Sequence, residues 1–519
     1  MSEEANSQAT EGVFLSRAAV SGVPWMVLSK AVLFLVYMGL SISTVRFLGK
    51  EKYGLYSLSM NLVEYLAVLC ALGLNSALLR FIPELTVRRN RAGLRRLLWK
   101  VLGLQQAAVV AMGFALWFAR PWLDRWFHAD FQSLPLFIAV LISAVLFKDF
   151  LNDTNTGFFR SRRVAVLSMA NGAVWLGLLW LLLSRGAEVH RVFLAQILSL
   201  VLLYAVGAAL LVRDFRRMDW RSPPYGIGKR RTLKLSIPTM MNTMLRMLML
   251  KYTEVFFLGV YWGTAVVGVY DLGYSTPFMA LTLVPSALQT LFTSGFAEAY
   301  ARDPKCLGRL IDSVYKMLIL TVVPLAAFGF FFAPRAVVLF YGAAMKDAGT
   351  VAAAFSLLHV LPLISMPLSM AITTKEKVLN MLPYMLLQVV MNLGLDWLLI
   401  PRFGIPGAVG AVLATFVLTI PLRLRAVRQI VGGIYFPTRF LLRTLGVAAL
   451  LSGALSFLAP HVNVAGLFAL GLAYLGVFAV SIRVVKLLSP ADVRDLRSLG
   501  LGKINRVLDL LVGRGHQAS

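Results

Sequence analysis

The sequence predicts an all-α polytopic membrane protein with about fourteen transmembrane helices. Hydrophobic residues make up 59% of the 519 positions and charged residues only 14%, whereas a soluble domain carries about a quarter charged residues. Apolar runs of roughly twenty residues, the length that a helix needs to cross a ~30 Å hydrocarbon core, recur along the whole chain. An internal repeat further predicts two six-helix lobes followed by two C-terminal helices.

The apolar runs give the position of each expected element. The spans are predicted near residues 22–44, 54–76, 99–118, 132–151, 164–184, 192–212, 237–260, 266–290, 310–332, 349–371, 379–400, 405–422, 441–459 and 464–486. They divide the chain into an N-terminal lobe (1–215), a C-terminal lobe (216–430), a pair of further spans (431–487) and a tail (488–519). The tail is expected to form a basic amphipathic helix on the inner leaflet.

The net charge of +27 is explained by the position of the cations. They concentrate in alternate loops, around Arg80–Lys100, Arg160–Arg163, Arg213–Lys234 and Arg423–Arg443, and in the tail. Cytoplasmic loops of membrane proteins carry such an excess, so both termini are predicted in the cytoplasm, with the chain in the cytoplasmic (inner) membrane. The charge therefore indicates topology and contact with anionic membrane lipids, and not nucleic-acid binding.

Two pairs of similar segments, each pair called an echo below, predict the repeat. Phe47-Leu48-Gly49 with Gly54-Leu55-Tyr56 resembles Phe257-Leu258-Gly259 with Gly268-Val269-Tyr270, at an offset of about 210 to 214 residues. Trp180 and Trp397 lie in a second echo with a similar offset. An even number of spans per repeat makes the repeats parallel, with an axis along the membrane normal and a cavity between the lobes. Chance similarity in apolar sequence is the alternative.

Ionisable residues inside the spans are the candidate functional groups, because a charge at the bilayer centre costs about 2.5–3.5 kcal/mol. Lys148 and Lys316 lie close enough to the cytoplasmic end to snorkel. Lys30 is deeper, and it either pairs with Glu64 on the next span or lines a cavity. Four further embedded ionisable residues lie outside span seven. Asp149 is a neighbour of Lys148, and Asp271 and Asp396 are expected at the outer ends in capping or interfacial roles. For His359 a satisfied core position is favoured over a proton relay.

Span seven carries the densest set of polar residues. Asn242, Arg246, Lys251 and Glu254 fall within one arc of a helical wheel. Lys251 and Glu254 are three residues apart and can pair locally. Arg246 has no acid within a turn of its own helix, and its guanidinium fork suits a diphosphate. The alternative is a structural bond from Arg246 to Asp271 or Glu64.

Several motifs give the chain a family resemblance. Arg46-Phe47-Leu48-Gly49, Gly73-Leu74-Asn75, Leu79-Arg80-Phe81-Ile82-Pro83-Glu84 and Ile400-Pro401-Arg402-Phe403-Gly404 resemble the motifs of polysaccharide and oligosaccharide-lipid exporters (Wzx type). These exporters belong to the multidrug/oligosaccharidyl-lipid/polysaccharide (MOP) superfamily. The resemblance implies two six-helix lobes around a cationic cavity. It also implies a flippase that carries undecaprenyl-pyrophosphate-linked glycans from the inner to the outer leaflet by alternating access.

On this resemblance each candidate residue has an expected role. Arg246, Lys251, Lys30 and Glu254 are expected to bind substrate, and Arg46, Arg80, Glu64 and Asp271 are candidates for gating or pairing. Two features depart from the family pattern. Many such flippases have twelve spans, whereas fourteen are expected here, as in lipid II flippases of the superfamily. The usual aspartate of span seven is Glu254.

Other functions are disfavoured by what the sequence lacks. It contains no P-loop, nucleotide-binding pattern or metal-ligand cluster, so we expect no enzyme, cofactor or metal. Short loops and the lack of paired catalytic carboxylates argue against a membrane polymerase or ligase. An ion-coupled multidrug exporter or a lipid II flippase is the alternative transporter, and Arg246 favours an anionic substrate. A polysaccharide polymerase and glycosyltransferases are the expected protein partners.

Overall fold

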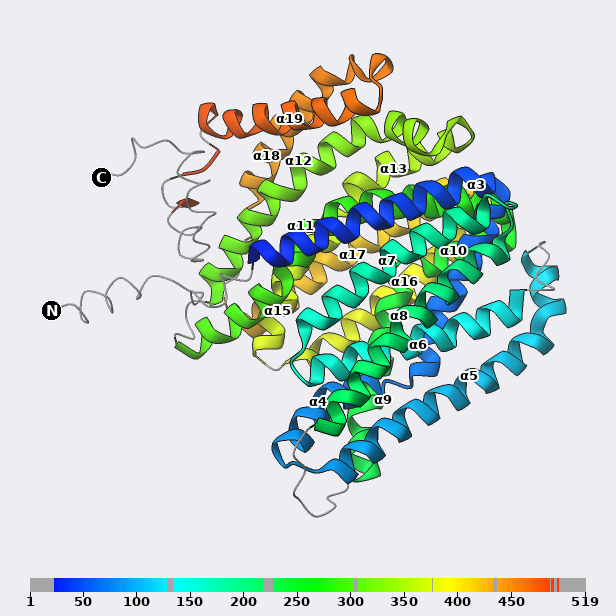
Figure 1. Cartoon of the computed structure of the whole chain (residues 1–519). Helices are drawn as coiled ribbons and strands as arrows, with labels where there is room; N and C mark the ends of the chain where they lie inside the picture. Colours follow the sequence, from blue (N-terminus) through cyan, green and yellow to red (C-terminus); the bar gives the residue numbers. More distant parts are fainter. Residues whose placement is uncertain are drawn as a thin grey trace. The chain divides into compact units, whose positions relative to one another are not determined.

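The computed structural model describes residues 23–127, 134–217, 227–302, 307–375, 377–432, 436–485, 487–489 and 492–493. Every regular element in these ranges is helical (Figure 1), which confirms the all-α class. The chain divides into two compact units. We call residues 35–271 with 392–408 the N-terminal unit, and residues 1–34, 272–391 and 409–519 the C-terminal unit.

The N-terminal unit is built mainly from the first half of the chain. Its helices are most of α3 (Val23–Ala71), α4 (Asn75–Val87), α5 (Arg91–Phe127), α6 (Leu134–Gly157), α7 (Ser161–Leu183), α8 (Val189–Arg217), α9 (Lys229–Leu248) and α10 (Tyr252–Trp262), with the start of α11 and the end of α16. Helix α6 packs against α4, α5 and α8, and α7 packs along α8. The short helix α4 therefore lies against long apolar helices.

The C-terminal unit contains the start of α3 and all or part of the remaining helices. They are α11 (Thr264–Arg302), α12 (Leu307–Tyr341), α13 (Lys346–Leu358), α14 (Val360–Ile364), α15 (Met366–Thr374), α16 (Leu382–Phe403), α17 (Ile405–Val431), α18 (Thr438–Ser456) and α19 (Val464–Val484), with 3-10 turns η2 (Ala343–Met345), η3 (Val378–Met381) and η4 (Ala459–His461). Helices α13, α18 and α19 pack on α12 (Figure 1). A core of buried apolar side chains, including Tyr315 and Phe478, holds this group together.

The described residues contain eleven helices that are long and apolar enough to cross a membrane. Helix α3 covers the first two predicted spans, which are separated by the non-helical Gly49. The seventh predicted span falls on α9 and α10, and the eighth falls on α11. The structure is therefore compatible with fourteen spans. The lobe boundaries at 215, 430 and 487 stay a prediction, and the expected tail helix lies almost wholly outside the described residues.

Two glycines break the helices at equivalent points of the proposed repeat. Gly49 (φ 71°, ψ −179°) and Gly263 (φ 81°, ψ 175°) have the same conformation, which is accessible to glycine and strained for other residues. Gly259, which the sequence aligns with Gly49, lies buried within α10 instead. That alignment is wrong by four residues, because a local echo of letters does not show which glycine breaks the helix.

The glycines five residues after these breaks bring two helices into backbone contact. A Cβ on Gly54 would lie 1.7 Å from the carbonyl oxygen of Thr264, and a Cβ on Gly268 would lie 3.0 Å from the backbone nitrogen of Gly54. The two helices approach this closely only because neither position carries a side chain. The two halves of the first echo thus pack against one another inside the N-terminal unit.

Candidate functional site

The sequence motif around Arg80 anchors α4 to the start of α9. Glu84 accepts two hydrogen bonds from Arg231, at 3.0 and 2.9 Å, and these bonds hold the pKa of Glu84 below its ordinary value. The Arg231 guanidinium also lies 4.9 Å from the ring centre of Phe81. Arg80 is exposed and reaches the Glu84 carboxylate at 3.6 Å. The motif is therefore structural at Phe81 and Glu84, and it leaves Arg80 on the surface.

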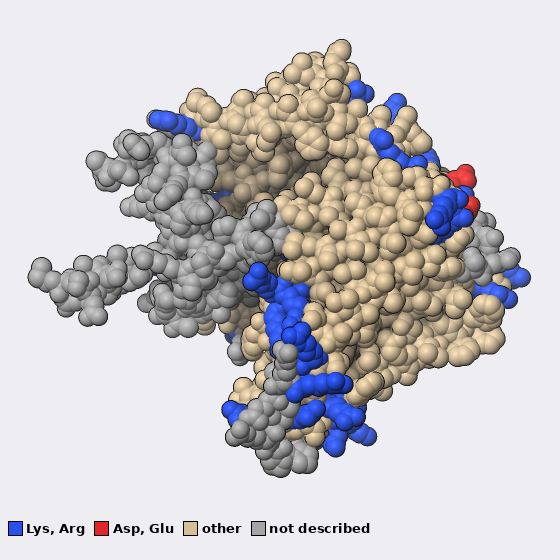
Figure 2. Space-filling view, in the orientation of Figure 1, with Lys and Arg blue, Asp and Glu red and all other residues tan. Residues whose placement is uncertain are grey.

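The other basic loops of the N-terminal unit meet at one end. Asp214, at the end of α8, pairs with Arg160 and Arg163, at the start of α7. Arg91, at the start of α5, lies over the ring of Phe215. Figure 2 shows Lys and Arg side chains gathered where α4 and α9 lie. Three loops that the charge pattern assigns to one side of the membrane therefore lie at one end of the unit.

Span seven is interrupted at the position of its charged residues. Helix α9 ends at Leu248 and α10 begins at Tyr252, although the sequence predicts one continuous helix. Arg246 lies in the last turn of α9 and is exposed. It makes no ion pair with any residue that the structure describes. Lys251 directly precedes α10. A broken helix at membrane depth is typical of transporter binding sites, because its free backbone groups can bind a ligand.

The Lys251 side chain turns to α11 for its partner. Its ammonium forms an ion pair with Asp271, which also accepts a hydrogen bond from Tyr53 at 3.1 Å. Asp271 is 6% exposed and forms the kind of pair expected of it, while its capping or interfacial role stays a prediction. Tyr252 donates a hydrogen bond to Glu64. The two acids proposed as structural partners of Arg246 are thus bound by other groups, and the charge of Lys251 is neutralised locally.

Glu254 belongs to a separate buried cluster that also contains Asp396. The amide nitrogen of Asn392 lies 3.2 Å from a Glu254 oxygen and 2.8 Å from an Asp396 oxygen. Thr253 donates a second hydrogen bond to Glu254, at 3.2 Å. Glu254 and Asp396 are at most 1% exposed, and the capping or interfacial role of Asp396 stays a prediction. Within the described residues, Asp396 Oδ1 has no hydrogen-bond partner.

This geometry limits the charge that the cluster can carry. Two carboxylates that share one amide, away from water, cannot both be ionised unless a positive species joins them. A proton on one carboxyl group, or a small monovalent cation between the two, would supply that charge. The free Oδ1 of Asp396 is the oxygen that such a species would reach.

The sequence of the chain is similar to that of a known protein family. A family model described as "Polysaccharide biosynthesis protein" matches residues 44–350, which is more than half of the chain. The chain belongs to this family. No curated protein sequence matches it.

Three solved structures that resemble this family member are a flippase and two transporters. A lipid II flippase, MurJ, in an inward closed conformation has a TM-score of 0.69 and 13% identity, covering 90% of this chain and 99% of that one. An inward-facing multidrug resistance MATE transporter of the MOP superfamily has a TM-score of 0.60 and 17% identity, covering 78% and 98%. A MOP superfamily transporter from Pyrococcus furiosus has a TM-score of 0.57 and 17% identity, covering 79% and 96%. The polysaccharide biosynthesis protein described here has the MOP superfamily fold.

The remaining candidates include two exposed cations. Lys30 and Arg46 are exposed on α3. The pairing of Lys30 with Glu64 stays a prediction. Lys148 pairs with the adjacent Asp149 at 3.1 Å.

Lys316 and His359 are buried ionisable residues whose partners lie within the protein. Lys316 is 8% exposed and pairs with Asp312 and with Asp492, the latter at 2.6 Å, so it does not snorkel. His359 is buried among Tyr274, Phe278 and Phe355, and its Nε2 lies 3.0 Å from the Tyr274 carbonyl oxygen. This arrangement is that of a satisfied core histidine.

Proposed function

We propose that the chain is a flippase that moves polyprenyl-pyrophosphate-linked oligosaccharide repeat units from the inner to the outer leaflet of the cytoplasmic membrane. Membership of the polysaccharide biosynthesis family and a fold like that of a lipid II flippase support this proposal. The observation that carries it is the interruption of span seven beside Arg246. Both termini would face the cytoplasm, where glycosyltransferases build the substrate, and a polymerase would receive it outside.

Arg246 is the residue that would bind the diphosphate. Its guanidinium can donate two parallel hydrogen bonds to phosphate oxygens, and its exposure leaves it accessible to a ligand. The first N–H groups of α10 lie a few residues further on, at a helix end that favours anions. Lys251 would contribute full positive charge only if its pair with Asp271 opens, so Arg246 would carry most of the binding.

The Glu254–Asp396 pair would couple transport to an ion gradient. Uptake or release of a proton or a monovalent cation changes the charge buried around Asn392, and a buried charge change of this kind favours one conformation over another. This role would account for two acids inside a protein that carries an anionic substrate. Alternating access would then need no nucleotide hydrolysis.

Substitution of Arg246 tests the substrate role in cells that depend on this protein for surface glycan. Arg246→Ala should reduce glycan display by about tenfold or more, since a hydrogen-bonded charge pair contributes about 1.5–3 kcal/mol. Arg246→Lys should retain part of the activity, because a point charge replaces the fork. Surface glycan, lipid-linked precursor in the inner leaflet and membrane abundance are measured together.

Arg162→Ala is the matched control, because Arg162 is also exposed and lies away from the break in span seven. Full glycan display by Arg246→Ala would refute the substrate role. Loss of the protein from the membrane would instead assign Arg246 to the structure. Drug resistance that changes with Arg246 while glycan display does not would favour a multidrug exporter.

A further inference from the structure

Glu64 is an exposed carboxylate within a predicted membrane span. It lies in the second half of α3, seven residues before the helix ends at Ala71. Because a charged side chain is costly in contact with the hydrocarbon core, the exposed surface of Glu64 must face water or a polar ligand. An acid in such a position is a candidate for ligand binding.

A residue of the interrupted span seven positions this carboxylate. The Tyr252 hydroxyl donates a hydrogen bond to Oε2 of Glu64, and Tyr252 is the first residue of α10, directly after the break. Among the described residues, this is the only hydrogen bond that Glu64 makes. The second oxygen, Oε1, can therefore accept hydrogen bonds from a ligand.

Two contacts show how the end of α3 lies along α9 and the break. A Cβ on Gly73 would lie 2.1 Å from the Ser236 carbonyl oxygen, and Tyr252 reaches Glu64 further along. The two segments therefore run side by side in opposite directions. Glu64 is nine residues from Gly73, about 14 Å along the axis, and Arg246 is ten residues from Ser236, about 15 Å. The exposed carboxylate and the exposed guanidinium thus lie at about the same level.

The opposite charges of Glu64 and Arg246 suit different parts of one ligand. A guanidinium binds phosphate oxygens, whereas a carboxylate repels them. The group next to the carboxylate must donate hydrogen bonds or carry positive charge, because a carboxylate can only accept. Sugar hydroxyl and amide groups are donors of this kind. A diphosphate with a sugar attached would therefore match both residues.

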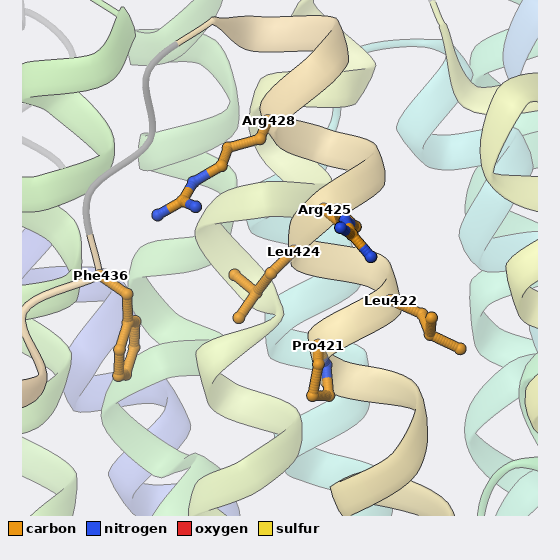
Figure 3. Close-up of a pocket in the computed structure, with 6 residues that line it drawn as sticks. All are labelled: Pro421, Leu422, Leu424, Arg425, Arg428 and Phe436. Carbon is orange, nitrogen blue, oxygen red and sulfur yellow. The ribbon is translucent and has the colours of Figure 1, made fainter.

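A cavity of about 370 Å³ beside the C-terminal end of α17 is less suited to a sugar. Its described lining consists of Pro421, Leu422, Leu424, Arg425, Arg428 and Phe436. None of these side chains accepts hydrogen bonds. In Figure 3 Arg425 and Arg428 extend to different sides of α17. Sugar hydroxyl groups would thus find no side-chain acceptor in this described lining.

We propose that Glu64 binds the first sugar of the glycan, with Oε1 accepting hydrogen bonds from its hydroxyl or amide groups. Tyr252 is a positioning residue that holds the carboxylate. The inference rests on the proposed flippase function, in which Arg246 binds the diphosphate. A polyprenyl diphosphate without a sugar has no donors for Glu64 and places phosphate beside the carboxylate. Glu64 therefore selects the finished glycolipid over the bare carrier lipid.

Binding of two lipids to the purified full-length protein tests this selectivity. One is the lipid-linked precursor that accumulates in cells without the protein, and the other is undecaprenyl diphosphate. Glu64→Gln should weaken precursor binding by about tenfold, because a neutral amide is a weaker acceptor than a carboxylate. It should bind undecaprenyl diphosphate at least as well as the unmodified protein does, since the repulsion is gone.

Tyr252→Phe tests the positioning role. Phenylalanine keeps the ring but removes the hydroxyl that holds the carboxylate, so precursor binding should weaken by about threefold. Binding of undecaprenyl diphosphate should stay unchanged. An equal loss for both lipids would show that Tyr252 only supports the fold of the site.

Glu51→Gln is the matched control, because Glu51 is another exposed glutamate of α3. It should change neither affinity by more than about twofold. Equal weakening of both lipids by Glu64→Gln would overturn the sugar role. Reduced glycan export with both affinities unchanged would make Glu64 a gating residue and overturn it as well.

Arg246→Ala separates this inference from the proposed function. It should weaken binding of both lipids, since both carry the diphosphate. If it weakened neither, the proposed role of Arg246 would fail, whatever the effect of Glu64→Gln. Tetraphenylphosphonium is the third probe. Binding of this organic cation that is lost in Glu64→Gln would assign the carboxylate to a cationic drug and overturn the sugar role.

Discussion

The two units bury charge in different ways. In the N-terminal unit, the Lys251–Asp271 pair and the Glu254–Asp396 pair join residues of different helices, and each acid is at most 6% exposed. In the C-terminal unit, Lys316 pairs with Asp312 on its own helix and with Asp492 just beyond α19, and its partners are 17–19% exposed. The acids of the first network are therefore more deeply buried than the acids of the second.

This difference shows which charges are candidates for function. A charge whose partners are partly exposed can be satisfied by solvent if one partner is lost, so its pairing requires no functional explanation. Four ionisable groups deep in one unit are costly to bury. Their retention in the N-terminal unit favours a role in transport, whereas Lys316 is better explained as an anchor for the segment that follows α19.

The largest effect expected from this comparison is on stability. Lys251→Met leaves Asp271 buried without a counter-charge, which costs about 3–5 kcal/mol, so membrane abundance and the temperature of unfolding should both fall. Adding Asp271→Asn should restore most of the stability, because the uncompensated charge disappears. Blotting of membranes and thermal unfolding of the purified protein measure both.

Lys316→Met is the matched lysine substitution in the other unit. It should cost about 1 kcal/mol, since water can reach Asp312 and Asp492. If Lys316→Met destabilised the protein as much as Lys251→Met, the contrast between the units would be wrong.

The second effect concerns transport and its dependence on an ion gradient. Asp396→Asn keeps the shape of the side chain but removes its charge and its capacity to bind a proton. Glycan export should fall by about 5- to 150-fold, the usual range of a coupling free energy, and should no longer respond to an imposed proton or sodium gradient. Export and membrane abundance are compared at several external pH values.

Asp149→Asn serves as the control acid, since Asp149 lies in a different helix and is 38% exposed. It should change export by no more than about twofold. If export by Asp396→Asn still responded to the imposed gradient, the Glu254–Asp396 pair would not be the group that couples transport to the ion.

The sequence predicts the spans well because length and composition decide whether a helix can cross a membrane. It does not predict the break at Met249–Lys251, since none of these residues is a glycine or proline. Nor does it predict that Lys251 pairs with Asp271, which depends on how α10 packs beside α11. Asn392 and Asp396, four residues apart on one helical face, were the available signal for the Glu254 cluster.

The smallest expected effect is a pH-dependent contribution from Asp492. Burial raises the pKa of Asp492, but hydrogen bonds from Lys316 and Ser489 lower it by more than burial raises it. The pKa of Asp492 is therefore below its ordinary value. A carboxyl group whose pKa is lower in the folded state stabilises the protein above its unfolded pKa of about 3.9. That contribution is lost as the pH falls through the lower, folded value. Asp492→Asn should therefore cost about 1 kcal/mol at pH 7 and almost nothing at the acid end of the titration.

Thermal unfolding of the purified protein between pH 7 and pH 3 measures this change. Glu51→Gln is the control, because Glu51 is an exposed carboxyl group and should leave the profile unchanged. The Ser489 amide and hydroxyl both lie within 2.8 Å of Asp492 Oδ2, and an asparagine oxygen can still accept these bonds. The pH-dependent part of the loss therefore reports the ion pair with Lys316. A loss of equal size at pH 7 and pH 3 would show that Asp492 acts through its hydrogen bonds to Ser489 alone, and Lys316 would then contribute no anchoring charge.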